Sequence, residues 1–318
     1  MIDLTDKKIL LIRNDNIGDL ICTTPAIEAL RKHYPSAQID IVVNSYNYDA
    51  IHDNPFVDTI YCYTKPKHKK GIIAKIQAGF GKLKMLFSIA SQGYDATVVF
   101  RGGYSKSAEL FAKIARAKHR IGVKNSHGRD SYTQHITPKP HIHEVMFCFE
   151  CLEPFGVSYA GEKTRYAIPA SLKEKFVYHS EAILFHISSR ILDNQFPKEK
   201  FLVIIEHLKS YPVLISAEPQ DVSKAQWLAD KSHATFVKTS SLNELGGLIA
   251  NVKLFVTLDG GAMHLAPALG TKTIALSGKT NMQQWHPWGY AHLVLQDDSK
   301  KAENIDLASI IKTIQENL

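Results

Sequence analysis

The chain has 318 residues, of which 45% are hydrophobic and 22% are charged. This composition is typical of a globular protein and excludes fibrous, collagen-like and disordered chains, and the length suits two domains of about 150 residues each. The formal net charge of +7 favours anionic partners without identifying them. No apolar run reaches the roughly 20 residues that span a bilayer, and the first residues lack a secretory signal, so we expect a soluble intracellular protein.

The first half of the chain alternates short apolar runs with helical patterns. Strands are predicted at 7–13, 38–44, 58–63 and 95–100, and helices at 24–35 and 107–117. Because the strands are continuously apolar and do not alternate with polar residues, they favour a parallel sheet that is covered on both faces.

The same pattern starts again after a polar stretch at 161–180. Strands are predicted at 182–188, 212–218, 234–240, 253–259 and 271–278, and helices at 199–210, 223–232, 242–251, 262–270 and 303–318. The sequence therefore predicts two α/β domains. We assign 1–165 to the N-terminal domain, 166–302 to the C-terminal domain, and 303–318 to a terminal helix for which packing on the N-terminal domain is considered.

Several apparent motifs do not indicate a cofactor or a metal. Cys148 and Cys151 form a C-x-x-C within an aromatic-rich stretch, so we predict buried thiols rather than redox or metal ligands. His141 and His143 beside Glu144 are a weak metal candidate, because no zinc-type spacing accompanies them. The sequence SGKT at 277–280 lacks the glycine that a P-loop requires at 273, and no G-x-G-x-x-G follows a strand.

Two loops after predicted strands carry candidate chemistry, since ligands of parallel sheets bind at the carboxyl ends of strands. Gly18 and Asp19 follow the first strand; the glycine permits a tight bend, and the aspartate can reach a bound hydroxyl. A cap at a helix N-terminus is an equal alternative for Asp19.

The second loop runs from Asp259 to His264, between a predicted strand and a predicted helix. Gly260 and Gly261 would expose backbone N–H groups at the helix N-terminus, where the helix dipole adds positive potential. That arrangement is suited to a diphosphate, and a tight turn with a buried histidine is the alternative.

A basic segment at 65–84 contains seven lysines and no acidic residue. A solvated loop and helix face would explain it, and so would contact with a phosphorylated lipid or an anionic membrane leaflet. Nucleic acid is disfavoured as a partner, because no aromatic residues alternate with the lysines and no DNA-binding motif is present.

Two of these regions match a known family. Residues 12–43, IRNDNIGDLICTTPAIEALRKHYPSAQIDIVV, resemble the N-terminus of the ADP-heptose:lipopolysaccharide heptosyltransferases, glycosyltransferase family 9. Residues 254–278, LFVTLDGGAMHLAPALGTKTIALSG, resemble the second signature of that family, usually D-[ST]-G-x-M-H-L-A followed by A-L-G-T. The similarity covers nearly the whole chain in matching order.

The resemblance implies a GT-B fold, in which two Rossmann-like α/β domains hold the active site in the cleft between them. It also implies inverting, metal-independent transfer of heptose from ADP-heptose to the lipopolysaccharide core or a related anionic, lipid-linked saccharide. The N-terminal domain would bind this acceptor and the C-terminal domain the nucleotide sugar. No cofactor is expected beyond the donor, and the expected location is cytoplasmic, with peripheral contact with the inner membrane.

The resemblance further implies roles for individual residues, with Asp19 as the catalytic base. The donor-binding residues would be Ser188, Ser189, Arg190, Glu218 (or Asp221), Asp259, Gly260, Gly261, Ala262, Met263 and His264. The acceptor-binding residues would be Asn16, Gly18, Arg101, Lys67, Lys69 and Lys70.

The chain departs from the family pattern at the phosphate site. Asn194 and Phe196 stand where relatives commonly have the lysine and tryptophan of K-x-W-P, and Gly260 replaces a serine or threonine. The missing charge would come from Arg190, Lys198 or Lys279. Two alternatives therefore stay open, namely a GT-B protein of another reaction class, such as an epimerase or hydrolase, and a non-catalytic binding protein.

Overall fold

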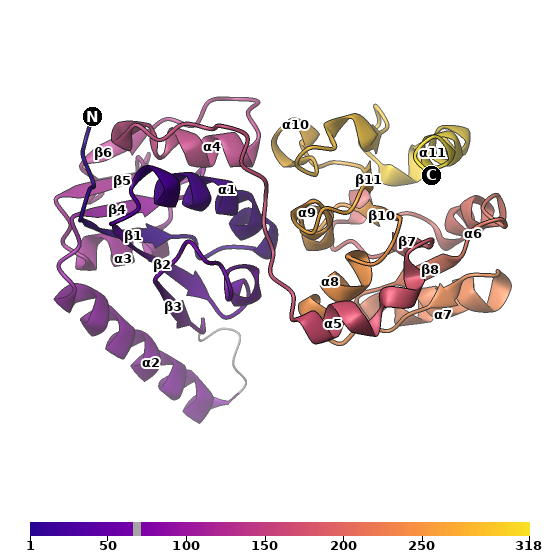
Figure 1. The fold of residues 1–318 in the computed structure, drawn as a ribbon, viewed down its shortest axis with the longest axis horizontal. Helices are drawn as coiled ribbons and strands as arrows, with labels where there is room; N and C mark the ends of the chain where they lie inside the picture. The colour runs from indigo at the N-terminus through magenta and orange to yellow at the C-terminus, as the bar shows by residue number, and fades with distance from the viewer. Residues whose placement is uncertain (66–70) are drawn as a thin grey trace. The chain divides into compact units, whose positions relative to one another are not determined.

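The computed structural model describes residues 1–65 and 71–318, without the side chains of residues 72–76. The chain divides into two compact units, Met1–Thr164 and Arg165–Leu318. Each unit has a six-stranded sheet (Figure 1). Among the described residues, no helix is both long enough and apolar enough to cross a membrane.

The sheet of the first unit has the strand order β3-β2-β1-β4-β5-β6, and every neighbouring pair is parallel. Its strands are β1 (Lys8–Ile12), β2 (Gln38–Asn44), β3 (Thr59–Tyr63), β4 (Ala96–Val99), β5 (His119–Val123) and β6 (Gln134–Ile136). Its helices are α1 (Ile17–His33), α2 (Ile72–Ser91), α3 (Lys106–Ile114) and α4 (Glu144–Glu150).

The sheet of the second unit repeats this topology with the strand order β12-β11-β10-β7-β8-β9, again with parallel pairs throughout. Its strands are β7 (Ile183–His186), β8 (Val213–Ser216), β9 (Thr235–Phe236), β10 (Leu254–Leu258), β11 (Thr273–Ser277) and β12 (Val294–Gln296). Its helices are α5 (Ala170–Lys175), α6 (Lys198–Glu206), α7 (Val222–Lys231), α8 (Leu242–Ile249), α9 (Gly261–Ala268), α10 (Met282–Trp285) and α11 (Leu307–Gln315).

The two-domain parallel α/β architecture predicted from the sequence is confirmed, and its physical basis is visible in the strands. The central strands β4, β7 and β10 are buried along their whole length, as expected where helices cover both faces of a sheet. In each unit the chain reverses its direction of strand addition once, between β1 and β4 and between β7 and β10. Such switch points are where open α/β sheets bind their ligands.

Helix α1 begins at Ile17, seven residues before the predicted start at 24, and it continues through Pro25. Proline has no N–H to donate to the carbonyl of Ile21. The Thr24 hydroxyl donates to that carbonyl instead, at 2.7 Å. The residue beside the proline therefore compensates for the missing backbone hydrogen bond, and Asp19 lies inside the helix.

The C-terminal helix α11 packs within the second unit. Ile310 and Ile314 of α11 are fully buried in the core of that unit, and α11 contacts α6. Packing on the N-terminal domain is therefore not needed to bury the apolar side of this helix.

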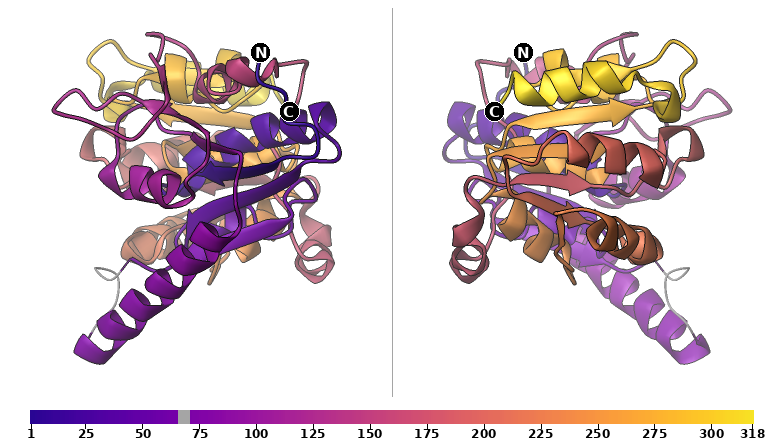
Figure 2. Two further views of the ribbon diagram at one scale, coloured as in Figure 1. Left: turned by 90° about the vertical axis from the view of Figure 1, so that its left-hand side faces the viewer. Right: turned by 90° about the vertical axis from the view of Figure 1, so that its right-hand side faces the viewer.

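Helix α2, which the sequence analysis did not predict, contacts α3 and β3 of the first unit. Its buried side chains Met85 and Ile89 belong to a core cluster that also contains Leu10, Phe111 and Tyr132. Figure 2 shows the N-terminal end of α2 extending beyond the sheet of its own unit.

Candidate functional site

Arg13 is the centre of the switch point in the first unit. It directly follows β1, and its side chain is fully buried. Its Nη2 donates to Asp19 Oδ1 at 3.0 Å and to Glu144 Oε1 at 2.7 Å, and its Nε lies 3.2 Å from Asp15 Oδ1. Burial alone would lower the pKa of Arg13, but the carboxylates of Asp15, Glu144 and Asp19 raise it well above its usual value. The guanidinium is thus a permanent buried cation held by three acids.

Asp19 is the third residue of α1, and its side chain is 15% exposed. The N-cap position belongs to the exposed Asn16, so the alternative that Asp19 caps the helix is wrong. A carboxylate in the first turn of a helix is stabilised by the helix dipole and by the free N–H groups there. Asp19 is therefore a partly exposed carboxylate at the switch point, and the buried Arg13 holds it in place.

Asp15 connects this loop with the one that follows β4. Its Oδ2 lies 3.1 Å from Arg101 Nη1, and Arg101 lies two residues after the end of β4. Burial raises the pKa of Asp15 to about 6; the charge of Asp19 adds to this rise, whereas Arg13 and Arg101 oppose it. The structure therefore brings the predicted residues Asp19 and Arg101 into one charged cluster.

Three members of this cluster, Arg13, Asp15 and Glu144, were not predicted as site residues. Glu144 had been weighed as a metal ligand together with His141 and His143. In the structure its carboxylate contacts Arg13, while His143 Nδ1 accepts from the N–H of Val145 at the start of α4. Within the described part of the chain, no group of three or more His, Cys, Asp or Glu side chains could hold a metal ion.

The remaining predicted acceptor residues are only partly placed. Gly18 is buried in the first turn of α1, and Lys67, Lys69 and Lys70 lie outside the described residues. Lys65, just before them, donates to the carbonyl of Asn14 at 2.9 Å, and the Asn14 amide donates to the Tyr63 hydroxyl at 3.0 Å. The segment after β3 therefore contacts the loop after β1, and Arg13 of that loop is the partner of Asp19.

The two cysteines of the C-x-x-C sequence lie in the interior of the first unit. Cys148 and Cys151 are fully buried, which confirms the predicted thiols. Burial raises the pKa of Cys148 to about 12 despite the neighbouring Arg13, so this thiol remains protonated at neutral pH.

In the second unit, Asn194 joins the loops after β7, β10 and β11. Its amide donates to Asp259 Oδ2 at 2.7 Å and to Thr280 Oγ1 at 2.8 Å, and its carbonyl oxygen accepts from the N–H of Gly278 at 2.8 Å. The Thr280 hydroxyl also donates to Asp259 Oδ2, at 2.7 Å. Asn194 is fully buried, so it satisfies a buried carboxylate without carrying a charge itself.

The glycine loop of the second unit begins a helix, as predicted. Gly260 is the N-cap of α9, and a Cβ atom added at this position would meet nothing within 4 Å. Met263 is fully buried and His264 nearly so, with its ring 6.0 Å from that of Trp285. The first turn of α9 therefore presents backbone N–H groups rather than the side chains of Met263 and His264.

The other predicted donor residues lie after β7 and β8. The Ser188 hydroxyl accepts from the N–H of Glu218 at 2.9 Å, and Arg190 Nε donates to Glu218 Oε2 at 3.1 Å. Burial would raise the pKa of Glu218, but hydrogen bonds from Gln220 and Arg190 lower it. Ser189 accepts from the N–H of Ile191 at 3.4 Å. Arg190 is thus paired with Glu218.

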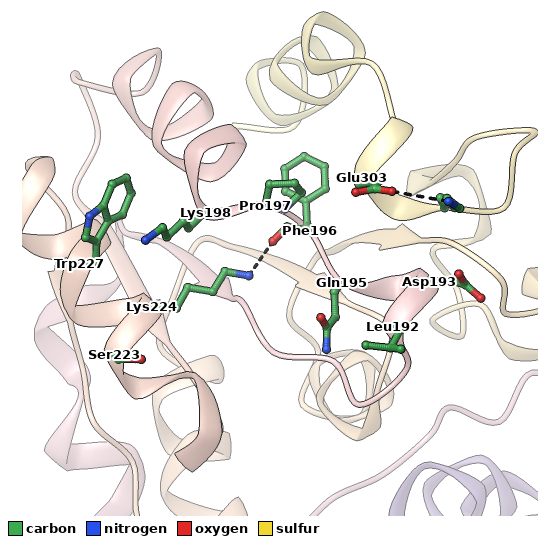
Figure 3. A pocket seen from close by; sticks show the side chains of 11 residues that line it. Leu192, Asp193, Gln195, Phe196, Pro197, Lys198, Ser223, Lys224, Trp227 and Glu303 are labelled. Atoms are coloured by element: carbon green, nitrogen blue, oxygen red, sulfur yellow. Dashed lines mark hydrogen bonds and ion pairs between the residues drawn. The ribbon is translucent and has the colours of Figure 1, made fainter.

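A cavity of about 750 Å³ lies beside this region, between the 3-10 turn Leu192–Asn194, α6, α7 and the turn Ala302–Asn304. Figure 3 shows Lys224 reaching the carbonyl of Phe196, at 2.6 Å, and Lys198 beside Trp227, with Nζ 4.4 Å from the ring centroid. None of the predicted donor residues lines this cavity. Lys198, which the sequence analysis offers as a source of the missing charge, therefore contacts the ring of Trp227.

Comparisons with known proteins identify the family of the chain. A family model described as glycosyltransferase family 9 (heptosyltransferase) matches residues 83–314. Lipopolysaccharide heptosyltransferase 3 of Escherichia coli is 25% identical over 290 residues, which are 85% of this chain and 83% of that protein. Lipopolysaccharide heptosyltransferase 1 of Salmonella typhimurium is 22% identical, over 96% of this chain and 99% of that protein.

Solved structures share the fold. A glycosyl transferase family 9 protein from Veillonella parvula has a TM-score of 0.85 at 20% identity, covering 99% of this chain and 98% of that chain. The E. coli heptosyltransferase WaaC with ADP has a TM-score of 0.79 at 18% identity, covering 98% and 100%. The expected two-domain GT-B fold is confirmed.

Proposed function

Since the chain belongs to glycosyltransferase family 9 (heptosyltransferase), it is a glycosyltransferase, and we propose that it transfers heptose from ADP-heptose to a lipopolysaccharide core saccharide. Curated relatives that match most of this chain are named lipopolysaccharide heptosyltransferases, and one similar structure holds ADP. The single observation that carries the mechanism is the Asp19 carboxylate, which Arg13 holds at the switch point of the first unit.

In the proposed reaction Asp19 is the general base. Its Oδ1 accepts from Arg13, and no described residue donates to its Oδ2, which can therefore take a proton from the acceptor hydroxyl. The acceptor oxygen forms a bond with the anomeric carbon of heptose as the bond from that carbon to the diphosphate breaks. ADP leaves with the electron pair, and the anomeric configuration is inverted. Asp19 lies outside the range that the family model matches, so this role rests on geometry and on the resemblance of residues 12–43.

Arg13 and Glu144 position the base in this mechanism. A buried guanidinium with fixed geometry holds the Asp19 carboxylate in one orientation, and Glu144 holds the guanidinium through a 2.7 Å contact. Because Glu144 and Asp15 share the charge of Arg13, the cation does not act on Asp19 alone. Arg13 and Glu144 act through Asp19 and need not touch the substrate.

The second unit would hold the donor without a metal ion. The N–H groups in the first turn of α9 and the dipole of that helix would stabilise the diphosphate charge that develops on the leaving ADP. Ser188 and Ser189 would donate hydroxyl protons to phosphate oxygens, and Glu218 would accept from the nucleoside hydroxyls. Lys279 is exposed and directly precedes Thr280 of the Asn194 network, so it is the nearest candidate in sequence for the missing positive charge.

The acceptor would be anionic and lipid-linked, and it would be met at the cytoplasmic face of a membrane. The lysine-rich segment 65–84 and Arg101 supply positive charge on the unit that carries the base.

The proposal is tested by nucleotide selectivity followed by transfer. We expect ADP to raise the melting temperature more than UDP, GDP or CMP, since a ligand at 100 times its Kd stabilises the folded state by about 2.7 kcal/mol. Mass spectrometry of heptose-deficient lipopolysaccharide incubated with ADP-heptose should then show one added heptose. Selective stabilisation by another nucleotide, or ADP binding without a product, would contradict the proposed donor or acceptor respectively.

A further inference from the structure

Helix α2 carries an apolar stripe that faces solvent. Phe80, Leu83 and Phe87 are 69%, 48% and 68% exposed. With about 100° between successive residues of an α-helix, these side chains fall within about 60° of one another. Met85 and Ile89, which anchor α2 in the core of the first unit, lie on the opposite side of the helix. The stripe is therefore not an extension of the core.

Exposure of this kind is unusual within this chain. Among the described residues, Phe80 and Phe87 are the only exposed phenylalanines, and the others are buried or half-buried. Single exposed apolar residues are common on protein surfaces, but a continuous stripe marks an interaction site. Two phenylalanines and a leucine one helical turn apart form such a stripe.

The charge of α2 indicates which partner the stripe fits. The helix contains no acidic residue. Lys84 is exposed and lies about 40° from Phe80 around the helix, where its ammonium group can reach the same surface. Residues 65–70, which precede α2 in the sequence, contribute four further lysines. A basic helix with aromatic and leucine side chains on one face is typical of segments that lie in the interface of an anionic bilayer.

We propose that α2 docks this protein on an anionic lipid surface, with Phe80, Leu83 and Phe87 entering the headgroup and acyl boundary. The inference rests on the proposed function, because a lipid-linked acceptor is embedded in such a surface. The inference adds to the proposed function that apolar side chains of α2 enter the bilayer, in addition to the attraction between lysines and anionic lipids.

The docking helix is joined to the base through described contacts. Lys82 of α2 places its ammonium group 5.2 Å from the ring centroid of Tyr63, and the Tyr63 hydroxyl accepts from Asn14. Asn14 directly follows Arg13, the residue that holds Asp19. A surface that binds α2 would therefore lie against the unit that carries the base.

The test is flotation of the full-length protein with vesicles of phosphatidylglycerol and phosphatidylethanolamine, compared with vesicles of phosphatidylcholine. We expect the wild type to bind the anionic vesicles. The double variant Phe80→Ser, Phe87→Ser should bind them at least about tenfold more weakly, because two phenylalanine side chains that would be buried in the bilayer are lost. The variant keeps every lysine, so the loss reports apolar insertion. Tyr178→Ser, which removes an aromatic side chain 91% exposed on the second unit, is the control and should bind like the wild type.

A second measurement locates the helix in the bilayer. Tryptophan fluorescence of a Phe80→Trp variant should be quenched by brominated lipids beyond the quenching of the three native tryptophans in the wild type. Equal vesicle binding by wild type and double variant, or no added quenching at position 80, would overturn the proposal. So would sedimentation showing a wild-type dimer that the double variant loses, because the stripe would then bind a second copy.

Failure of this inference can be told apart from failure of the proposed function. The melting-temperature rise with ADP and the transfer of heptose to a delipidated acceptor should be the same in the double variant as in the wild type. Loss of vesicle binding with transfer retained supports docking by α2. Transfer absent in the wild type, with vesicle binding intact, would contradict the proposed function and leave the docking surface in place.

Discussion

The two switch points share one topology and differ in charge. In the first unit, the fully buried Arg13 contacts three carboxylates and the site is built from full charges. In the second unit, the equally buried Asn194 carries no charge and hydrogen-bonds with Asp259, Thr280 and the N–H of Gly278. A site for proton transfer needs an ionised group that is held in place, whereas a site for a diphosphate needs hydrogen-bond donors. In the proposed reaction the first switch point would hold the base and the second would bind the leaving diphosphate.

The largest effect is expected on kcat, from a change at the residue proposed as the base. Asp19→Asn keeps the shape of the side chain and the contact with Arg13 but removes the base, so kcat should fall about 10² to 10⁴-fold while ADP binding stays unchanged. Asp49→Asn, at an exposed position of the same unit, is the matched control. Turnover by Asp19→Asn at the wild-type rate would refute the base assignment.

The second prediction separates positioning from binding. In Glu144→Gln, Arg13 loses one of its three carboxylate partners, so the orientation and charge balance at Asp19 should change. We expect kcat to fall about tenfold, or 1.4 kcal/mol, with little change in the KM of either substrate and with an altered acid side of the pH–rate profile.

The control for Glu144→Gln lies on the same helix. Glu150 at the end of α4 pairs with Lys139 at 2.7 Å and has no contact with Arg13. Glu150→Gln should leave the pH profile unchanged. If both variants change only stability, Glu144 has a purely structural role.

Much of the fold could be predicted from the sequence, because fully buried parallel strands appear as apolar runs. The strands β5, β6 and β12 were missed because HRIGV, QHI and VLQ are short and mostly not fully buried. The start of α1 was misplaced because Pro25 normally marks a first helical turn, whereas here Thr24 compensates for it. Local sequence does not report such a side-chain substitute for a backbone hydrogen bond.

The candidate sites were predictable where the signal was local. Asp19 and the two glycines at the start of α9 lie within a few residues of the end of a strand, so their position was visible in the sequence. The pair Arg13 and Glu144 is separated by 131 positions, and nothing in either segment indicates that the two meet. Asn194 in place of the lysine left a non-catalytic protein open as an alternative, but the chain belongs to a glycosyltransferase family. In the structure, Asn194 is a buried hydrogen-bond donor to Asp259.

The third prediction concerns the hydrogen-bond network of Asn194. Asn194→Ala leaves Asp259 and the N–H of Gly278 without a partner from this residue, so the free energy of unfolding should fall by about 1–3 kcal/mol. The loops after β7, β10 and β11 lose their common contact, so ADP should stabilise the variant less than the wild type. Asn304→Ala, which removes one exposed hydrogen bond to Ser299, is the control. An unchanged melting temperature in Asn194→Ala would show that the network is dispensable.

The smallest effect is a pH dependence that belongs to the charged site alone. The folded protein raises the pKa of Asp15 from 3.8 to about 6, chiefly by burial. Between these values the unfolded chain has already lost the proton that the folded protein still holds, so the unfolded state binds fewer protons and stability falls as pH rises. Asp15→Asn should therefore flatten the decline in unfolding free energy between pH 4 and pH 6, whereas Asp49→Asn should keep it. A decline of equal slope in Asp15→Asn would assign it to another titratable group and contradict the raised pKa of Asp15.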